Sequence, residues 1–424
     1  MENPASSPNP GKWAPRFFTF WGGQVVSLVG SNLVQFALVW WLTRTTGSAT
    51  VLATATLIAT LPEIFLYPFT GTLVDRWNRK AVMIFADSSI AFATLVLVLL
   101  FLTGHESIGA VYVILFIRSA GTTFHFPAEA ASVALMVPKE HLARIAGLNQ
   151  TISGILSIIA PPLGALLIGL LPMQGVLAID VGTAILAVSI LAFITIPQPP
   201  GQLAQENGTA VKTSYWQDLR AGWKYMTAWP GLMGVTLLAM GVNFVMTPAT
   251  SLSPLVVTRE YHGGVMQLGL VDSFLGIGVI LGGLALSAWG GFKKRIHTCM
   301  MGIAGLGAGI LIYGLMPSNW FPVAVGGIFL LGFMEAMANG PMDAILQANV
   351  DPNMLGRVFS LLIAGARTMA PLSLLVAGPV ADWLGVRTWY LIGGSMCIVM
   401  AVTALFIPAI MKMEENRQQQ PAAG

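Results

Sequence analysis

Twelve long apolar runs place the strongest constraint on the fold of this chain. A helix that spans a membrane needs about 20 apolar residues. Only 9% of the 424 residues are charged, against about 25% in soluble domains, so charge is too sparse to cover a soluble surface. The chain is therefore predicted to be an all-α integral membrane protein with twelve transmembrane helices. The runs lie at approximately 16–42, 48–74, 81–103, 108–136, 146–170, 175–197, 230–257, 265–290, 297–316, 321–347, 358–380 and 388–410.

One long polar stretch separates the sixth run from the seventh and divides the chain into two six-helix bundles. Within it, Trp216, Leu219, Trp223 and Met226 recur at spacings of three, four and three, which is typical of a short amphipathic helix on the cytoplasmic membrane surface. The alternative is a helix that packs under the bundle and ties the halves together. The predicted segments are a tail at 1–15, a bundle at 16–197, a linker at 198–229, a bundle at 230–410 and a tail at 411–424.

The basic residues predict the orientation in the cell membrane. Sixteen of the 21 Lys and Arg residues fall on the side of the termini, and three, Arg44, Arg259 and Arg387, fall on the other. By the positive-inside rule, both termini and the linker are cytoplasmic. The basic residues form no single patch, so nucleic acid is not expected as a partner. The two cysteines lie inside apolar runs and provide neither a disulfide framework nor a zinc cluster.

A charged segment between the second and third runs carries the first family motif. Residues 71–80 read Gly-Thr-Leu-Val-Asp-Arg-Trp-Asn-Arg-Lys, and we expect a tight solvent-facing turn there. The order of Gly71, Asp75, Arg76 and Arg79 resembles the loop signature of the major facilitator superfamily of secondary transporters. A degenerate copy, Gly-Gly-Phe-Lys-Lys-Arg at 290–295, keeps the basic end and lacks the Asp-Arg pair.

The two halves repeat each other at an offset of 214 residues. Pro127 and Pro138 are matched by Pro341 and Pro352. In the fourth run, Arg118, His125 and Glu129 fall within a stripe about 40° wide at 100° per residue. The offset maps His125 onto Asn339 and Glu129 onto Asp343. Repeats of this kind hold their site between the halves, so we expect these groups to line a central cavity.

Ionisable groups inside membrane spans are functional candidates, because burying a charge there is costly. An alternative for Arg118 and Glu129 is a buried structural pair, and Asp87 and Asp180 are interpreted as polar anchors near the span ends. The candidates for proton coupling are Glu129, Glu335, Glu63, Asp343 and Asp272, and those for the cavity or substrate are Arg118, His125, Asn339, Gln24 and Arg367.

A carboxylate in a low-dielectric surrounding retains its proton more readily, and a nearby arginine opposes this. A cationic or amphiphilic substrate that displaces the proton would make the two ligands competitors, which is antiport. The sequence has no phosphate-binding Gly-Lys-Ser/Thr loop and no nucleophile motif. We therefore expect neither ATP use nor enzyme activity. We also expect no cofactor, with the proton gradient as the energy source.

Further motifs resemble the macrolide-efflux branch of the same superfamily. They comprise residues 115–119, 124–128, 178–181 and 355–360, and the similarity covers nearly the whole chain. The resemblance implies a carrier that works by alternating access and exports lipophilic compounds in exchange for protons. It also implies a conformational latch in which Asp75 meets the start of the eleventh helix near Arg357; the latch residues are Gly71, Asp75, Arg76, Arg79 and Arg357.

The predicted function is therefore a proton-driven exporter of amphiphilic drugs, with macrolides as one candidate cargo, acting as a monomer in the lipid bilayer. One alternative is an exporter of an endogenous amphiphile such as a siderophore or lysolipid. Another is a membrane receptor or scaffold that has lost transport, which would not need to keep the signature loop or the intramembrane carboxylates.

Overall fold

The computed structural model describes residues 13–196 and 215–414. Within those ranges, twelve helices are long and apolar enough to cross a membrane, which confirms the predicted number of spans. The described residues divide into two compact units, one made of 13–45 and 55–196 and the other of 46–54 and 215–414. The predicted side of the membrane for the termini stays a prediction.

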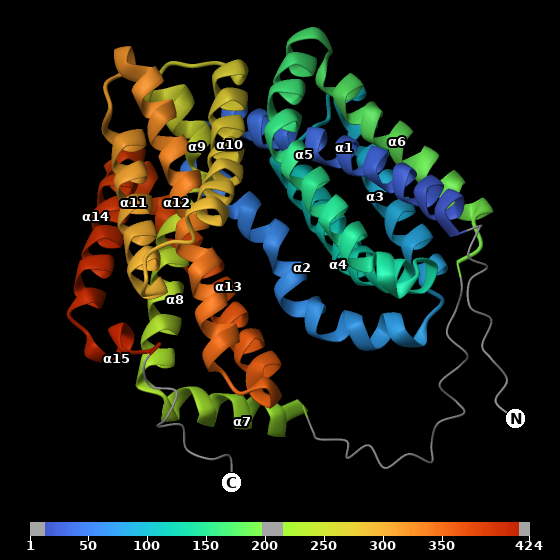
Figure 1. Cartoon of the computed structure of the whole chain (residues 1–424). Coiled ribbons are helices and arrows are strands. Elements are labelled where there is room, and N and C mark those ends of the chain that lie inside the picture. The colour runs from blue at the N-terminus through green and yellow to red at the C-terminus, as the bar shows by residue number, and fades with distance from the viewer. Residues whose placement is uncertain (1–12, 197–214, 415–424) are drawn as a thin grey trace, which may run out of the picture. The chain divides into compact units, whose positions relative to one another are not determined.

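The first unit contains six long helices, and Figure 1 shows their arrangement within the unit. They are α1 (Trp13–Thr46), α2 (Ala49–Arg76), α3 (Arg79–Thr103), α4 (Ile108–Met136), α5 (Leu142–Leu170) and α6 (Met173–Phe193), with a 3-10 turn at Lys139–His141 before α5. Helix α2 begins in the second unit and continues into the first.

The turn between α2 and α3 is shorter than the sequence predicted. Helix α2 continues to Arg76, and α3 begins at Arg79, so only Trp77 and Asn78 lie outside a helix. The side chain of Asn78 accepts a hydrogen bond from the backbone N–H of Ala81, which caps the exposed amides of α3. This cap stabilises the start of α3 only two residues after α2 ends. Most of the charged residues of the signature therefore lie in helix ends.

Helix α3 packs against both α4 and α6 in the first unit. Helix α1 packs against α6 at Gly30, where an added Cβ would lie 2.2 Å from Thr183 Oγ1, and against α5 at Gly164, where it would lie 2.9 Å from Phe36. Small residues of this kind let membrane helices approach closely. An apolar cluster at one end of the unit, including Phe17, Phe20 and Met83, completes the packing.

The second unit has six spanning helices and several shorter ones. In order they are α7 (Tyr215–Ala228), α8 (Pro230–Ser251), α9 (Ser253–Leu255), a π-helix (Val256–Glu260), α10 (Val265–Trp289), α11 (Arg295–Leu315), a 3-10 turn (Ser318–Trp320), α12 (Phe321–Asn349), α13 (Pro352–Leu384), α14 (Val386–Leu405) and α15 (Pro408–Met411). The seventh span therefore ends at Ser251 as an α-helix, before the predicted 257.

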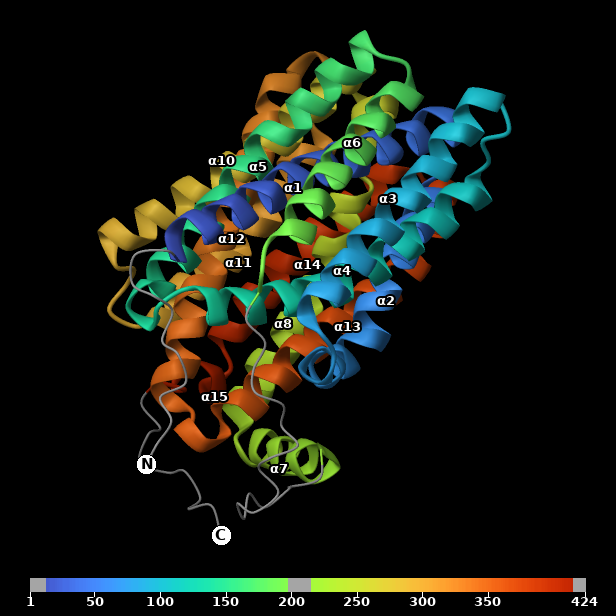
Figure 2. The same ribbon diagram turned by 90° about the vertical axis from the view of Figure 1, so that its right-hand side faces the viewer.

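Helix α12 is packed between α10 and α11, as both views show (Figures 1 and 2). Glycines make these contacts. A Cβ added to Gly332 would lie 2.2 Å from the carbonyl oxygen of Leu275 on α10, and one added to Gly302 on α11 would lie 2.5 Å from the backbone nitrogen of Ala338. Since real Cβ atoms do not approach so closely, the backbones meet only because side chains are absent there.

The segment predicted as a linker helix contains α7, a helix of 14 residues. It packs against α13 and α8. At Gly222 an added Cβ would lie 3.2 Å from Cβ of Arg357. Of the predicted apolar stripe, Met226 is 1% exposed and Trp223 is 56% exposed, and the side chains of Trp216 and Leu219 lie outside the described part of the chain. One side of α7 thus belongs to the packing of the second unit, and an indole is presented on another side, where a membrane surface can receive it.

Candidate functional site

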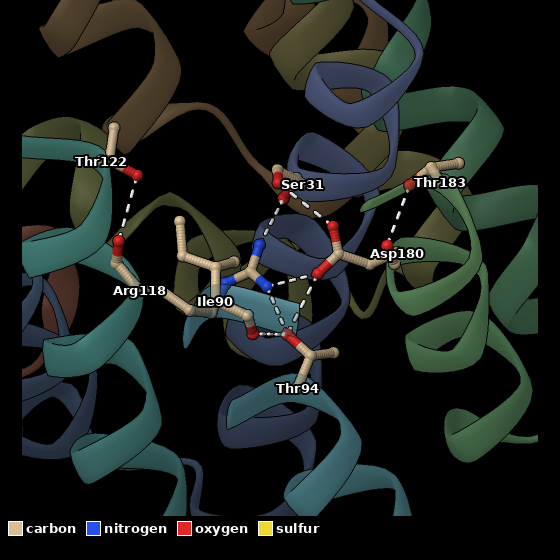
Figure 3. A network of polar contacts seen from close by, with 7 residues as sticks. All are labelled: Ser31, Ile90, Thr94, Arg118, Thr122, Asp180 and Thr183. Carbon is tan, nitrogen blue, oxygen red and sulfur yellow. Dashed lines mark hydrogen bonds and ion pairs between the residues drawn. The ribbon is translucent and has the colours of Figure 1, made fainter. Parts of the chain in front are cut away.

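A polar network in the first unit joins α1, α3, α4 and α6 around Arg118 (Figure 3). The guanidinium pairs with the carboxylate of Asp180 on α6 and donates to Thr94 Oγ1 on α3 at 2.6 Å. Thr94 Oγ1 lies 3.0 Å from Asp180 Oδ2, and Ser31 Oγ on α1 donates to Asp180 Oδ1 at 3.1 Å. The network closes on itself, so each charge is both paired and hydrogen-bonded.

This geometry corrects two interpretations of the sequence. Arg118 is paired with Asp180 and not with Glu129, and Asp180 is fully buried, not a polar anchor at a span end. Arg118 itself is 8% exposed. The close contact of α1 and α6 at Gly30 brings Ser31 within reach of Asp180. Arg118 is thus in a structural ion pair inside the bundle, and its predicted contact with substrate stays a prediction.

A second cluster links α3 to α4 through His125. His125 Nε2 lies 3.3 Å from Asp87 Oδ1, and His125 Nδ1 lies 3.8 Å from Glu129 Oε2 one helical turn further along α4. Asp87 is buried, and the side chain of Glu129 is 25% exposed. Asp87, predicted as an anchor, is therefore a direct partner of His125. An imidazole between two carboxylates can hold a proton in contact with either of them.

The second unit holds a cavity of about 110 Å³ between α8, α11 and α12. Its polar lining consists of Glu335, Asn339 and Asn243, together with the thiol of Cys299, which donates to the carbonyl of Ala338. The remaining walls are aliphatic or Met side chains. The predicted candidates Glu335 and Asn339 are thus brought together on α12, and Asn243 on α8 is a further polar group that the sequence did not single out.

Three intramembrane carboxylates of the second unit, Asp272, Glu335 and Asp343, form no ion pair with a described basic residue. Asp272 and Glu335 are half-buried, and Asp343 is exposed. A carboxylate without a cation in such a place is neutralised by a proton or a cationic ligand, or its charge is solvated by water.

The other predicted site residues are distributed over both units. Gln24 is buried in α1, and Glu63 is half-buried in α2. Arg367 is exposed on α13. The roles predicted for them stay predictions.

The predicted latch is described only in part. Arg79 donates to the carbonyl of Ala131 on α4 at 3.2 Å, and Arg357 is half-buried near the start of α13. The surroundings of Gly71 and the side chains of Asp75 and Arg76 lie outside the described part of the chain. The latch stays a prediction.

A carboxylate that sequence reasoning missed caps a helix. Asp382, near the end of α13, accepts hydrogen bonds from the backbone N–H of Ala49 and of Thr50 at 2.7 and 2.8 Å, and from Ser48 Oγ at 2.7 Å. These amides open α2 and have no partner within the helix. Arg259 adds a contact of 3.9 Å to the same carboxylate. The role of Asp382 could not be predicted from its position near a span end, because the groups that donate hydrogen bonds to it lie more than 300 residues earlier in the chain.

A tyrosine cluster surrounds the π-helix of the second unit. Tyr313 Oη lies 2.7 Å from Ser253 Oγ, and Tyr261 Oη donates to the carbonyl oxygen of Tyr313. Burial raises the pKa of Tyr261 to about 12, so its hydroxyl remains a hydrogen-bond donor at physiological pH. Arg387 pairs with Glu260 at 2.7 Å beside it. We interpret this cluster as structural support.

Comparisons with known proteins agree with this architecture. The family model of the Major Facilitator Superfamily matches residues 20–289 and 233–423. Macrolide efflux protein A of Streptococcus pyogenes is 33% identical over 402 residues, which is 95% of this chain and 98% of that protein. The multidrug efflux pump Tap of Mycolicibacterium fortuitum is 24% identical over 91% of this chain and 94% of its own length.

Solved structures show the same fold at low identity. A POT family transporter in complex with 5-aminolevulinic acid has a TM-score of 0.71 at 10% identity and covers 96% of this chain and 97% of its own. A point mutant of the nucleoside transporter NupG has a TM-score of 0.70 at 14% identity, with 93% and 99% covered.

The chain belongs to the Major Facilitator Superfamily. It is a multi-pass membrane transporter and not an enzyme, as the sequence predicted.

Proposed function

We propose that this transporter exports amphiphilic drugs across the cell membrane in exchange for protons. The cargo class is suggested by relatives named for macrolide and multidrug efflux. The observation that carries the proton step is the contact of His125 with Asp87 and Glu129 in spanning helices. Histidine changes charge between about pH 5 and 8, and two carboxylates beside it give a proton more than one place to bind.

The proposed exchange depends on competition between a proton and a cationic or amphiphilic cargo. Glu129 is the outermost group of the cluster, with 25% of its side chain exposed. A cationic cargo that reaches Glu129 neutralises its carboxylate in place of the proton. When the cargo leaves, the carboxylate can bind a proton again. Glu335, which lines an apolar cavity with two amides, is the second group at which such competition can occur.

The first test separates binding from coupling. Purified protein in liposomes with an imposed pH gradient is assayed for uptake of a fluorescent cationic dye. Glu129→Gln is expected to remove the dependence on the gradient while the dye still binds. Glu140→Gln, an exposed carboxylate outside the cluster, is the matched control and is expected to keep it. Unchanged coupling in Glu129→Gln would return Glu129 to a structural role.

The cargo is tested in cells. Expression is expected to raise the inhibitory concentration of macrolides or other amphiphilic drugs, and a protonophore is expected to increase their accumulation. Indifference to the protonophore would favour facilitated diffusion. If no drug in a broad panel is tolerated better, and lysolipid or siderophore export is observed, the endogenous cargo is correct.

A further inference from the structure

The cavity between α8, α11 and α12 has an apolar base and a polar rim. Val235 and Leu306 are 0% and 2% exposed and form its base. Asn243 and Asn339 are exposed and form its rim, and Glu335 is half-buried. The volume of about 110 Å³ equals that of about three or four water molecules in the liquid, at about 30 Å³ each. A small head group therefore fits in the cavity, and the rest of a drug-sized molecule lies outside it.

The acidic group of the cavity has no donor from its own walls. Among the described residues that line the cavity, Glu335 is the only acidic one and none is basic. The thiol of Cys299 donates to the carbonyl oxygen of Ala338, so its hydrogen is not available to the carboxylate. A carboxylate in a mostly aliphatic cavity is stabilised by a ligand that brings a positive charge and a hydrogen-bond donor together.

The two amides of the rim add hydrogen-bond acceptors. Asn243 Nδ2 donates to the carbonyl oxygen of Ala239 at 2.9 Å. Because a carbonyl oxygen only accepts hydrogen bonds, this bond fixes the orientation of the amide and leaves Oδ1 as its acceptor. Asn339 follows Glu335 by one helical turn on α12, and Cβ atoms at that spacing lie about 5–6 Å apart. One head group can therefore meet the carboxylate and both amides.

We propose that this cavity binds the head of a protonated alkylamine and selects it by its N–H groups as well as by its charge. The proposal rests on the export function proposed above, since the alkylamine is the head of the exported amphiphile. A primary ammonium has three N–H donors, which match the carboxylate and the two amide oxygens. The carbon atoms beside the nitrogen contact aliphatic side chains such as Val242 and Ile303. A quaternary ammonium has the same charge but no N–H donor, so it leaves the amide oxygens unpaired.

The test measures the affinity of the purified protein in detergent for pyrene probes that differ only in the group at the end of a butyl chain. Three probes end in a primary, a dimethyl or a trimethyl ammonium, and a fourth ends in tert-butyl, the neutral isostere of the trimethylammonium. Such amines are protonated at pH 7, as lysine is. Fluorescence anisotropy, corrected for partition into protein-free micelles, is expected to rank affinity in that order. The primary amine is expected to exceed the trimethyl probe by about tenfold, which equals about 1.4 kcal/mol.

Two variants assign this ranking to the cavity. Glu335→Gln is expected to bring the three ammonium probes close to the neutral one. Asn243→Leu is expected to weaken the primary amine about fivefold, the equivalent of about 1 kcal/mol for one hydrogen bond, and to leave the trimethyl probe unchanged. Asn32→Leu is the matched control and is expected to keep the ranking, because Asn32 Nδ2 makes the same kind of bond to the carbonyl oxygen of Leu28, at 2.7 Å, in the first unit. An unchanged ranking in both cavity variants would overturn the proposal.

The parent protein alone also decides the proposal, even where a variant fails to fold. Equal affinity for the primary and the trimethyl probe would overturn it, because the site would then recognise charge only. Carboxylate and amide oxygens also suit a hard metal cation, which a change of salt distinguishes. Sodium chloride and tetramethylammonium chloride are expected to give the same affinities at equal ionic strength. Weaker binding of the primary amine in sodium chloride would identify a sodium site and overturn the proposal.

Export and head-group selection are measured separately, so their failures can be told apart. Proton-driven dye export together with equal affinity for the primary and the trimethyl probe would keep the proposed function and overturn only the head-group site. The expected ranking without any proton-driven export would support the site and overturn the proposed function instead.

Discussion

Helices α4 and α12 have the same place in the two halves of the chain, yet their neighbours hold them in different ways. Each has 29 residues and an internal proline, Pro127 or Pro341. At the offset of those prolines, Arg118 of α4 corresponds to Gly332 of α12. Arg118 holds α4 to α3 and α6 through an ion pair and hydrogen bonds, whereas Gly332 lets the backbone of α12 touch α10.

One helical turn further along, the glycine is on α4 and the ionisable residue is on α12. Gly121 of α4, whose added Cβ would lie 2.7 Å from Ile90 of α3, corresponds to Glu335 of α12, which lines a cavity. Each ionisable group of α4 therefore has an oppositely charged or titratable partner in the first unit. The carboxylates of α12 have no such partner in the described residues. The charge of Arg118 has a packing role in the first helix, whereas the charge of Glu335 in the second is left available for a ligand or a proton.

The largest expected effect follows from breaking the ion pair of α4. Arg118→Leu leaves Asp180 buried without its cation, and removal of one partner of a buried pair costs about 3–5 kcal/mol. A large fall in thermal stability is therefore expected in detergent. The double variant Arg118→Leu/Asp180→Leu is expected to recover most of the loss. If the single variant is as stable as the parent, α4 is not held by charge.

The glycine contact of α12 is expected to be the next most sensitive. Gly332→Ala would place a Cβ 2.2 Å from the carbonyl of Leu275, and overpacking of this kind costs about 1–3 kcal/mol. Gly326 on the same helix has open space around it, so Gly326→Ala serves as the control and is expected to be neutral or stabilising. The melting temperatures of the two variants measure the contrast.

Glu335→Gln tests whether the carboxylates of α12 are functional. No ion pair is lost, so stability is expected to change little, and coupled dye export is expected to fall about tenfold, which equals about 1.4 kcal/mol. Asp343→Asn, at an exposed position of the same helix, is expected to have a smaller effect. A clearly lower melting temperature of Glu335→Gln with transport unchanged would reverse the assignment of roles.

The smallest expected effect concerns Asp382, a carboxylate of the second unit that has several partners. Asp382→Ala removes the cap from the first turn of α2, and loss of a capping group costs about 1 kcal/mol. A modest decrease in melting temperature is expected, with Asp382→Asn closer to the parent because its amide oxygen still accepts. If Asp382→Ala leaves the melting temperature unchanged, the cap does not stabilise α2.

The sequence predicted the spans and the repeat, and it predicted the partners of the charges poorly. Apolar runs specify spanning helices directly, and the paired prolines were enough to align α4 with α12. The stripe on α4 gave the direction of Arg118, but not which helix lies opposite, and Asp180 is 62 residues away. Asn243 and Asp382 are similar cases, since their importance arises from α12 and from the start of α2, which no local pattern connects to them.

The close backbone contacts of α12 limit which residues beside the cavity can be substituted. A larger residue at Gly278, Gly302 or Gly332 would push one helix away from another, so mutational drift at these positions is costly. We expect changes in cargo preference among descendants of this chain to arise instead on the facing wall formed by α8. There Val242, Asn243 and Met246 can change size without separating two main chains.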